Sequence, residues 1–376
     1  MANKISQEKH HKHPPLARPK IGHYHRCEWG IYGTSCAAIE AFFKDFEASL
    51  NGKLRLLFVD AEHGEKRANT KLQIREKQFN ISEGTGWNEY DDKLQYFATD
   101  AAFVNGNHYP ASRQMVFLNP KKRDSLKRRS AQLTNIQILI KEDAEQQIFD
   151  FLEEKITAET QIFTRTELPR VYSLLQNQIQ QAKPPLKALI LAGGKSQRMG
   201  EDKSQLVYHA GKSQELYIAQ MCQDLGLDVY LSKAYDFEAD TVNGIPVIKD
   251  RLLQMVPFGA ILSAMMQEPD TAWLVLACDL PFLNQDLLQK LIQQRNAGLF
   301  ATAVKSAAKP FPEPLVTIYE PRAYLRLLSF LSLGYACPRK VLINSDIHIL
   351  ELKDDKVIEN VNTPEERVAV LKKLNN

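Results

Sequence analysis

Short apolar segments that stop at a glycine pair or a carboxylate constrain this chain more than any other feature. Residues 186–191 are apolar except at Lys187 and lead through Ala192 into Gly193 and Gly194. Residues 272–278 are almost continuously apolar and stop at Asp279. Runs of this kind are typical of strands buried on both faces of a parallel sheet, and helical stretches alternate with them. The sequence therefore predicts an α/β fold with helices on both faces of its sheets.

The chain is long enough to hold two such three-layer domains. Its 376 residues exceed the usual size of one hydrophobic core. A first alternation of strands and helices begins near Glu28 and a second at Leu186, with a glutamine-rich stretch and two prolines between them. Residues 141–165 are polar and acidic and are predicted to be helical. We predict a polar tail at 1–20, a first domain at 21–165, a linker at 166–185 and a second domain at 186–376.

Composition argues against several classes of partner. The net charge of +3 is too small to favour nucleic acid, and no apolar run approaches the roughly 18 residues that span a membrane. The five cysteines are scattered and form no CxxC pair, which favours reduced thiols in a cytoplasmic protein. His10, His11 and His13 have no flanking cysteine or carboxylate, so a solvated tail is favoured over a metal site.

The turn at Gly193 and Gly194 is the first candidate binding site. Two glycines allow backbone N–H groups to approach an anion closely. Arg198 and Lys203 follow within ten residues and can add full positive charge. The turn lacks the G-x-x-x-x-G-K-[ST] and G-x-G-x-x-G patterns, so it is neither a P-loop nor a dinucleotide fingerprint. We expect a triphosphate clamp.

Further polar residues follow the strands of the second domain. Ser232, Asp250 and Asp279 all come at predicted strand ends, and ligands of parallel sheets bind at that edge. Asp279 is either a helix N-cap or a Mg²⁺ ligand; the phosphate-binding turn nearby favours the metal, because Mg²⁺ takes one or two carboxylates plus substrate phosphates.

The segment 360–366 is a further candidate. Thr363, Pro364 and Glu366 have the spacing of a capping box that starts a helix. Asn360 and Asn362 alternate with Val361 and could share a face that reaches a metal or a phosphate.

The second half resembles a known family. Residues 191–203, LAGGKSQRMGEDK, resemble the signature of MobA-type molybdenum cofactor guanylyltransferases, which belong to the nucleotidyltransferase superfamily with a Rossmann-like sheet. Asp250 and the segments 257–260, 277–281, 313–315 and 362–365 are similar to later motifs of that family, in the same order. Val256 departs from the glycine usual in the family's turn, and Ser232 from its frequent asparagine.

The resemblance implies transfer of GMP from Mg²⁺-bound GTP to the terminal phosphate of molybdopterin. It implies catalytic roles for Arg198, Lys203 and Asp279, and metal binding by Asp279 and Asn362. The implied nucleotide-binding residues are Leu191, Ala192, Gly193, Gly194, Ser196, Lys203, Ser232, Asp250 and Gly259.

The sequence is also compatible with other functions. The order L-A-G-G favours GTP, whereas sibling cytidylyltransferases usually carry L-A-A-G. The alternatives are a CTP-dependent enzyme, a transferase acting on a phosphorylated sugar or alcohol, and a non-catalytic scaffold for molybdenum cofactor.

The first half resembles the P-loop adapter of the same pathway, the MobB type, in its order of elements. Its loop at 33–38 lacks the Gly-Lys-Ser/Thr that would hold phosphates, so we expect a degenerate P-loop-like sheet without NTP hydrolysis. Its candidate ligands are molybdenum cofactor, a molybdoenzyme-maturation protein and a second copy of the chain.

Two groups of residues in the first half could bind a ligand. The strand-end residues are either a site or ordinary loop residues; they are Asp60, Glu62, His63 and His108. The basic run 121–129 is more simply a solvated helix face than an anion dock.

Overall fold

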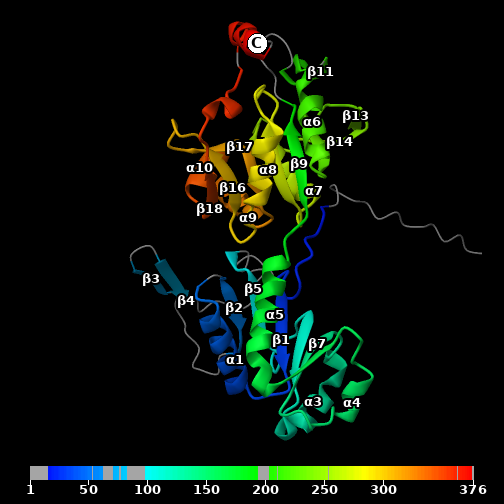
Figure 1. The fold of residues 1–376 in the computed structure, drawn as a ribbon. Coiled ribbons are helices and arrows are strands. Elements are labelled where there is room, and N and C mark those ends of the chain that lie inside the picture. Colours follow the sequence, from blue (N-terminus) through cyan, green and yellow to red (C-terminus); the bar gives the residue numbers. More distant parts are fainter. Residues whose placement is uncertain are drawn as a thin grey trace, which may run out of the picture. The chain divides into compact units, whose positions relative to one another are not determined.

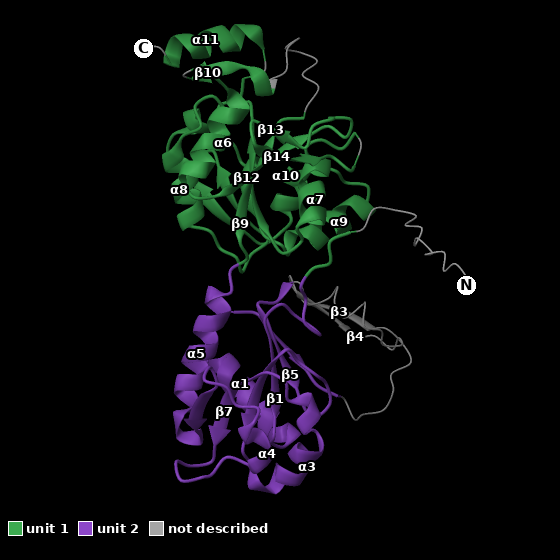
Figure 2. Cartoon of the chain, turned by 90° about the vertical axis from the view of Figure 1, so that its right-hand side faces the viewer, with its two compact units in different colours: residues 1–19, 184–376 green, residues 20–183 purple. Residues whose placement is uncertain are grey.

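A computed structural model describes residues 16–52, 54–61, 98–193, 203–209, 211–252, 254–361 and 363–374, and the backbone of 71–75 and 78–82. Lys20–Lys183 form one compact unit, and Pro184–Asn376 belong to a second (Figure 1, Figure 2).

The N-terminal unit contains a parallel sheet with the strand order β2-β5-β1-β6-β7-β8. Helices α1 (Cys36–Ser49) and α5 (Leu168–Gln181) share one core with Trp29 and Ile31 of β1. Helices α3 (Arg123–Arg128) and α4 (Asp150–Glu153) supply Leu126 and Leu152 to a second core. The strands are β1 (Glu28–Tyr32), β2 (Leu56–Val59), β5 (Ala101–Asn105), β6 (Arg113–Phe117), β7 (Ile136–Lys141) and β8 (Gln161–Thr164). Helices on both faces confirm the predicted three-layer α/β class. A separate antiparallel ladder joins β3 (Lys71–Arg75) to β4 (Gln78–Ser82).

The end of this unit differs from the sequence prediction. Residues 161–164, within the stretch predicted to be helical, form the edge strand β8, and α5 occupies most of the predicted linker. Val171, Leu175 and Ile179 recur every fourth residue along α5 and are buried in the core. This apolar stripe fixes the helix despite its many glutamines. The boundary between the units lies between Lys183 and Pro184.

The C-terminal unit contains a sheet of order β13-β14-β12-β9-β15-β17-β16-β18. Strands β14, β12, β9 and β15 are parallel to one another, whereas β17 is antiparallel to both of its neighbours. The strands are β9 (Leu186–Leu191), β12 (Asp228–Lys233), β13 (Thr241–Val242), β14 (Ile245–Lys249), β15 (Ala272–Ala277), β16 (Ala301–Lys305), β17 (Pro312–Tyr319) and β18 (Ile347–Glu351).

Helices cover both faces of this sheet as well. Helices α6 (Gln214–Asp224) and α8 (Gln285–Gln293) pack in one core. Helices α7 (Phe258–Gln267), α9 (Ala323–Ser332) and α10 (Pro338–Ile343) pack in the other. The hairpin of β10 (Val207–His209) and β11 (Lys212–Ser213) lies near α11 (Pro364–Leu374), with Tyr208 and Val370 in one small cluster (Figure 2). This arrangement confirms the second predicted three-layer domain.

One buried carboxylate organises the start of the N-terminal sheet. Glu28, the first residue of β1, is 1% exposed. Its carboxylate accepts hydrogen bonds from the backbone N–H groups of His23, Tyr24, His25 and Ser112 at 2.7–3.1 Å, and from the Ser112 hydroxyl. Burial raises the pKa of Glu28, but these hydrogen bonds outweigh it and hold the pKa below its ordinary value.

We expect Glu28→Gln to lower the free energy of unfolding by about 2–4 kcal/mol at pH 7, because the amide NH₂ would face N–H donors. Since the folded-state pKa is lowered, this stabilisation is present above the ordinary glutamate pKa and is lost as the pH falls through the folded value. Thermal unfolding of the full chain at several pH values measures the difference, which should shrink in acid. Exposed Glu47→Gln is the control and should leave the midpoint unchanged. A difference independent of pH would contradict this role for Glu28.

Candidate functional site

Three parallel strands bring Leu191, Ser232 and the residues that follow them to one edge of the C-terminal sheet. Leu191 at the end of β9 is paired with Ser232 of β12 on one side and Ala277 of β15 on the other. The chain therefore leaves all three strands at the same level. Gly193, Lys233 and Asp279 follow within two residues of these paired positions, as expected for a ligand-binding edge of a parallel sheet.

The first turn at this edge requires glycine. The Ala192 N–H donates to the Ser232 carbonyl at 3.0 Å, which draws the two loops together. A Cβ at Gly193 would lie 3.0 Å from backbone atoms of Lys233 and Ala234. Backbone cannot move aside as a flexible side chain can, so a larger residue would force the loops apart. This contact explains the first glycine of the pair without reference to a ligand.

The remaining residues of the signature are described only in part. Gly194, Ser196 and Arg198 lie outside the described residues. Lys203 begins the 3-10 turn η5 (Lys203–Gln205), and only its backbone is described. The roles expected of these residues remain predictions.

Asp250 follows β14 at the same edge and has a clear structural role. Its N–H donates to the Lys233 carbonyl at 2.9 Å, and its side chain is 6% exposed. Its Oδ1 accepts from the Leu252 N–H at 2.9 Å and from the Ser263 hydroxyl at 3.3 Å. A Cβ at Gly259 would lie 2.8 Å from this same oxygen. Asp250 and Gly259 therefore hold the loop after β14 against the first turn of α7.

The half-buried residue Asp279 is held beside the last segment of the chain. The Val361 N–H donates to the Asp279 carbonyl at 3.0 Å, and Val361 is 1% exposed. Thr363 and Glu366 exchange hydrogen bonds across the start of α11, which confirms the predicted capping box. Asn362 lies outside the described residues, but both of its neighbours are fixed. Burial raises the pKa of nearby Tyr208, with Arg367 opposing and Asp279 reinforcing the increase.

The first turn of α6 is a feature that sequence reasoning missed. Lys233 Nζ lies 2.6 Å from Glu215 Oε2, and the two side chains are only 6% and 1% exposed. Gln205 donates to the other Glu215 oxygen at 2.8 Å, and the Gln214 amide donates to the Leu280 carbonyl at 2.9 Å. These contacts connect α6 to all three segments at the site: the turn after Lys203, the end of β12 and the loop after Asp279. Lysine and glutamate are ordinarily exposed, so nothing local in the sequence indicates this buried pair.

We expect Lys233→Met or Glu215→Leu to cost about 3–5 kcal/mol of unfolding free energy, because each leaves the other charge buried and unpaired. The double variant should recover much of that loss, since no unpaired charge remains. Urea denaturation of the full chain measures all three. Lys373→Met is the control, because the side chains of its pair with Glu359 are 49% and 45% exposed and the pair should contribute little. If the single variants lost no more unfolding free energy than this control, the role of the pair would be contradicted.

The candidate residues of the N-terminal unit are brought together in part. His108 Nε2 lies 3.9 Å from Asp60 Oδ1, so two of the four strand-end residues are neighbours. Glu62 and His63 lie outside the described residues. In the basic run 121–129, Arg123 pairs with Asp150 at 2.7 Å and Arg129 donates to Asn107. These two arginines therefore have partners within the N-terminal unit.

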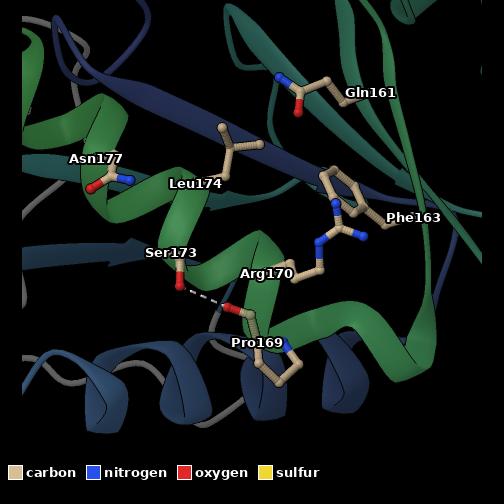
Figure 3. A pocket seen from close by; sticks show the side chains of 7 residues that line it. All are labelled: Gln161, Phe163, Pro169, Arg170, Ser173, Leu174 and Asn177. Atoms are coloured by element: carbon tan, nitrogen blue, oxygen red, sulfur yellow. Dashed lines mark hydrogen bonds between the residues drawn. The ribbon is translucent and has the colours of Figure 1, made fainter.

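A surface groove between α5 and β8 lies apart from these strand ends (Figure 3). Arg170 lies over the Phe163 ring and pairs with Glu167 outside the groove. The lining residues are Gln161, Phe163, Pro169, Arg170, Ser173, Leu174 and Asn177. They include no carboxylate, imidazole or thiol, so the groove offers no obvious reactive group.

Two kinds of feature are absent from the described segments. Within them, no group of three or more His, Cys, Asp or Glu side chains could hold a metal ion by itself. Among the helices described, none has both the length and the apolar character needed to cross a membrane.

The fold defines the C-terminal unit as a three-layer α/β domain with candidate residues at one edge of its sheet. Residues 188–347 match the family described as "MobA-like NTP transferase domain". The C-terminal half of the chain therefore contains a MobA-like NTP transferase domain, as the sequence predicted.

Curated relatives match about half of this chain. A molybdenum cofactor biosynthesis bifunctional protein of Synechocystis sp. is 33% identical over 49% of this chain and 53% of its own length. A molybdenum cofactor guanylyltransferase of Pseudomonas putida is 26% identical over 49% of this chain and 96% of its own length. A probable molybdenum cofactor guanylyltransferase of Nostoc sp. is 28% identical over 49% of this chain and 90% of its own length. The chain thus spans about half of the Synechocystis protein and most of the other two.

Proposed function

We propose that this chain transfers GMP from GTP to the terminal phosphate of molybdopterin, releasing pyrophosphate and forming molybdopterin guanine dinucleotide. Support comes from the MobA-like domain and from the names of the relatives that match it. The observation that carries the proposal is the shared edge where Leu191, Ser232 and Ala277 are paired, because it gathers a glycine turn and a carboxylate.

The reaction needs charge stabilisation more than proton transfer. A phosphate monoester is largely dianionic near neutral pH, so one of its oxygens attacks the α-phosphorus of GTP without a general base. The bond from the α-phosphorus to the bridging oxygen breaks, and pyrophosphate takes the electron pair. Backbone N–H groups near Gly193 bind phosphate oxygens, while Arg198 and Lys203 neutralise the leaving pyrophosphate.

Asp279 fits a magnesium ligand. It offers a half-buried carboxylate directly after β15, and the Val361 hydrogen bond fixes its backbone. One carboxylate with substrate phosphates and water is the donor set that Mg²⁺ prefers, and Asn362 would add an amide oxygen beside it. A bound Mg²⁺ would supply positive charge to the phosphates.

We expect Asp279→Ala and Lys203→Ala each to lower the rate of pyrophosphate release at least about 100-fold, because each removes charge that stabilises the transition state. Circular dichroism should show an unchanged fold. Asp286→Ala is the matched control, since this exposed carboxylate lies in the first turn of α8. Activity close to wild type in either site variant would refute the assignment.

The nucleotide is tested with the same assay. Purified full chain, molybdopterin and Mg²⁺ should release pyrophosphate with GTP and not with CTP. Pyrophosphate release with CTP alone would identify the chain as a cytidylyltransferase. If neither nucleotide released pyrophosphate and the chain bound molybdopterin tightly, the chain would be a cofactor-carrying scaffold instead of an enzyme.

A further inference from the structure

A cysteine and a histidine meet at the strand ends of the N-terminal unit. Cys36 is the first residue of α1 and follows the turn after β1. His108 lies in the loop after the neighbouring strand β5. Cys36 Sγ lies 3.3 Å from His108 Nε2, and both side chains are partly exposed. A thiol in hydrogen-bond contact with an imidazole is the arrangement of a nucleophile and its base.

Further hydrogen bonds fix this thiol. The Asn107 amide donates to the Thr34 carbonyl at 3.0 Å and contacts Cys36 Sγ at 3.6 Å. The Arg129 guanidinium donates two hydrogen bonds to Asn107. One goes to the side-chain oxygen of Asn107 at 2.8 Å, and the other goes to its backbone carbonyl at 2.9 Å. The guanidinium of Arg129 thus holds in place the amide that contacts the sulfur.

The histidine also has a carboxylate beside it. Asp60 Oδ1 lies 3.9 Å from His108 Nε2 and accepts hydrogen bonds from Asn105 at 2.8 Å and from the Ala61 N–H at 2.7 Å. The carboxylate is therefore close to the nitrogen that would receive the Cys36 proton. Cys36 is the first residue of α1, so the partial positive charge of the helix N-terminus lies beside its sulfur.

A second observation marks the same turn. The Thr34 hydroxyl is buried, with 1% of the residue exposed, and has no hydrogen-bond partner in the segments that the structure describes. Unsatisfied buried polar groups are uncommon in stable folds and recur where a ligand or a reaction accounts for them.

The chain supplies contrasting thiols. Burial raises the pKa of Cys222 to about 12, and it also raises the pKa of Cys27 against the opposing effect of Arg113. Such thiols are poor nucleophiles near neutral pH. Cys337 is exposed and precedes α10, which makes it a reference for an accessible cysteine in the same protein.

We propose that Cys36 is the nucleophile of a thiol–disulfide exchange site that accepts small anionic disulfides. The Sγ proton passes to His108 Nε2, and Sγ attacks one sulfur of the disulfide. The disulfide bond breaks, a new S–S bond joins Cys36 to that sulfur, and the other sulfur leaves as a thiolate with the electron pair. The substrate disulfide is itself the oxidant. The N-terminus of α1 favours an anionic substrate.

The test compares Cys36 with Cys337 in the full chain. Cys337→Ser leaves Cys36 and the half-buried Cys278 accessible, and Cys36→Ser leaves Cys337 and Cys278, so each rate is assigned to its own cysteine by peptide. Oxidised glutathione is the anionic probe and bis(hydroxyethyl) disulfide the neutral one, with mixed disulfides located by peptide mass spectrometry. We expect Cys36 to react at least about tenfold faster than Cys337 with oxidised glutathione at pH 7, and by a smaller factor with the neutral probe.

A third substitution, at His108, tests the role of this residue as the base. His108→Gln in the Cys337→Ser background should bring the Cys36 rate down to that of Cys337, while His108→Gln in the Cys36→Ser background should not change Cys337. The comparison of Cys36 with Cys337 needs no substitution at His108, so it stands even if that variant is unstable. Equal rates for the two cysteines, or a Cys36 rate that His108→Gln does not change, would overturn the proposal. Equal enhancement with both probes would overturn the preference for anions.

Discussion

The alignment of β9 between β12 and β15 is the constraint on which the C-terminal unit depends. Parallel pairing places Leu191 level with Ser232 and Ala277, so the loops after three strands begin side by side. Gly193 can then approach the backbone of Lys233 because it has no Cβ. A shift of one residue in this register would turn every side chain of a strand to the opposite face and separate the loops. The position of each strand-end residue follows from this pairing.

A second level of organisation connects those loops to a helix. Glu215 and Gln214, in the first turn of α6, hold the end of β12, the turn after Lys203 and the loop after Asp279. The buried charges of Lys233 and Glu215 and the two glutamine amides hold these segments in a defined orientation. A packed apolar surface would not do so, because hydrogen bonds fix direction as well as distance. The strand-end loops depend on this turn for their mutual spacing.

Much of this arrangement could be predicted from the sequence, and the reasons for the misses are physical. Apolar runs that end at Gly193 and Asp279 are local signals, so the strands and their shared edge followed directly. Helix α5 was missed because its glutamines obscured an apolar stripe of only three buried residues. Lys233 and Glu215, or Cys36 and His108, become partners only after distant segments fold together, and the latter pair is separated by 72 positions.

The hydrogen bond from Val361 to Asp279 also has a consequence for biosynthesis. The loop that carries Asp279 is completed by a segment made more than 80 residues later, whose Val361 and Val370 share a cluster with Leu206 and Tyr208. The N-terminal unit closes on itself by Lys183 and can fold while the remainder is still being translated, because domains generally fold as units during synthesis. The strand edge around Asp279 reaches its final form only after α11 has left the ribosome. A nascent chain would therefore complete its N-terminal unit well before the edge around Asp279 is assembled.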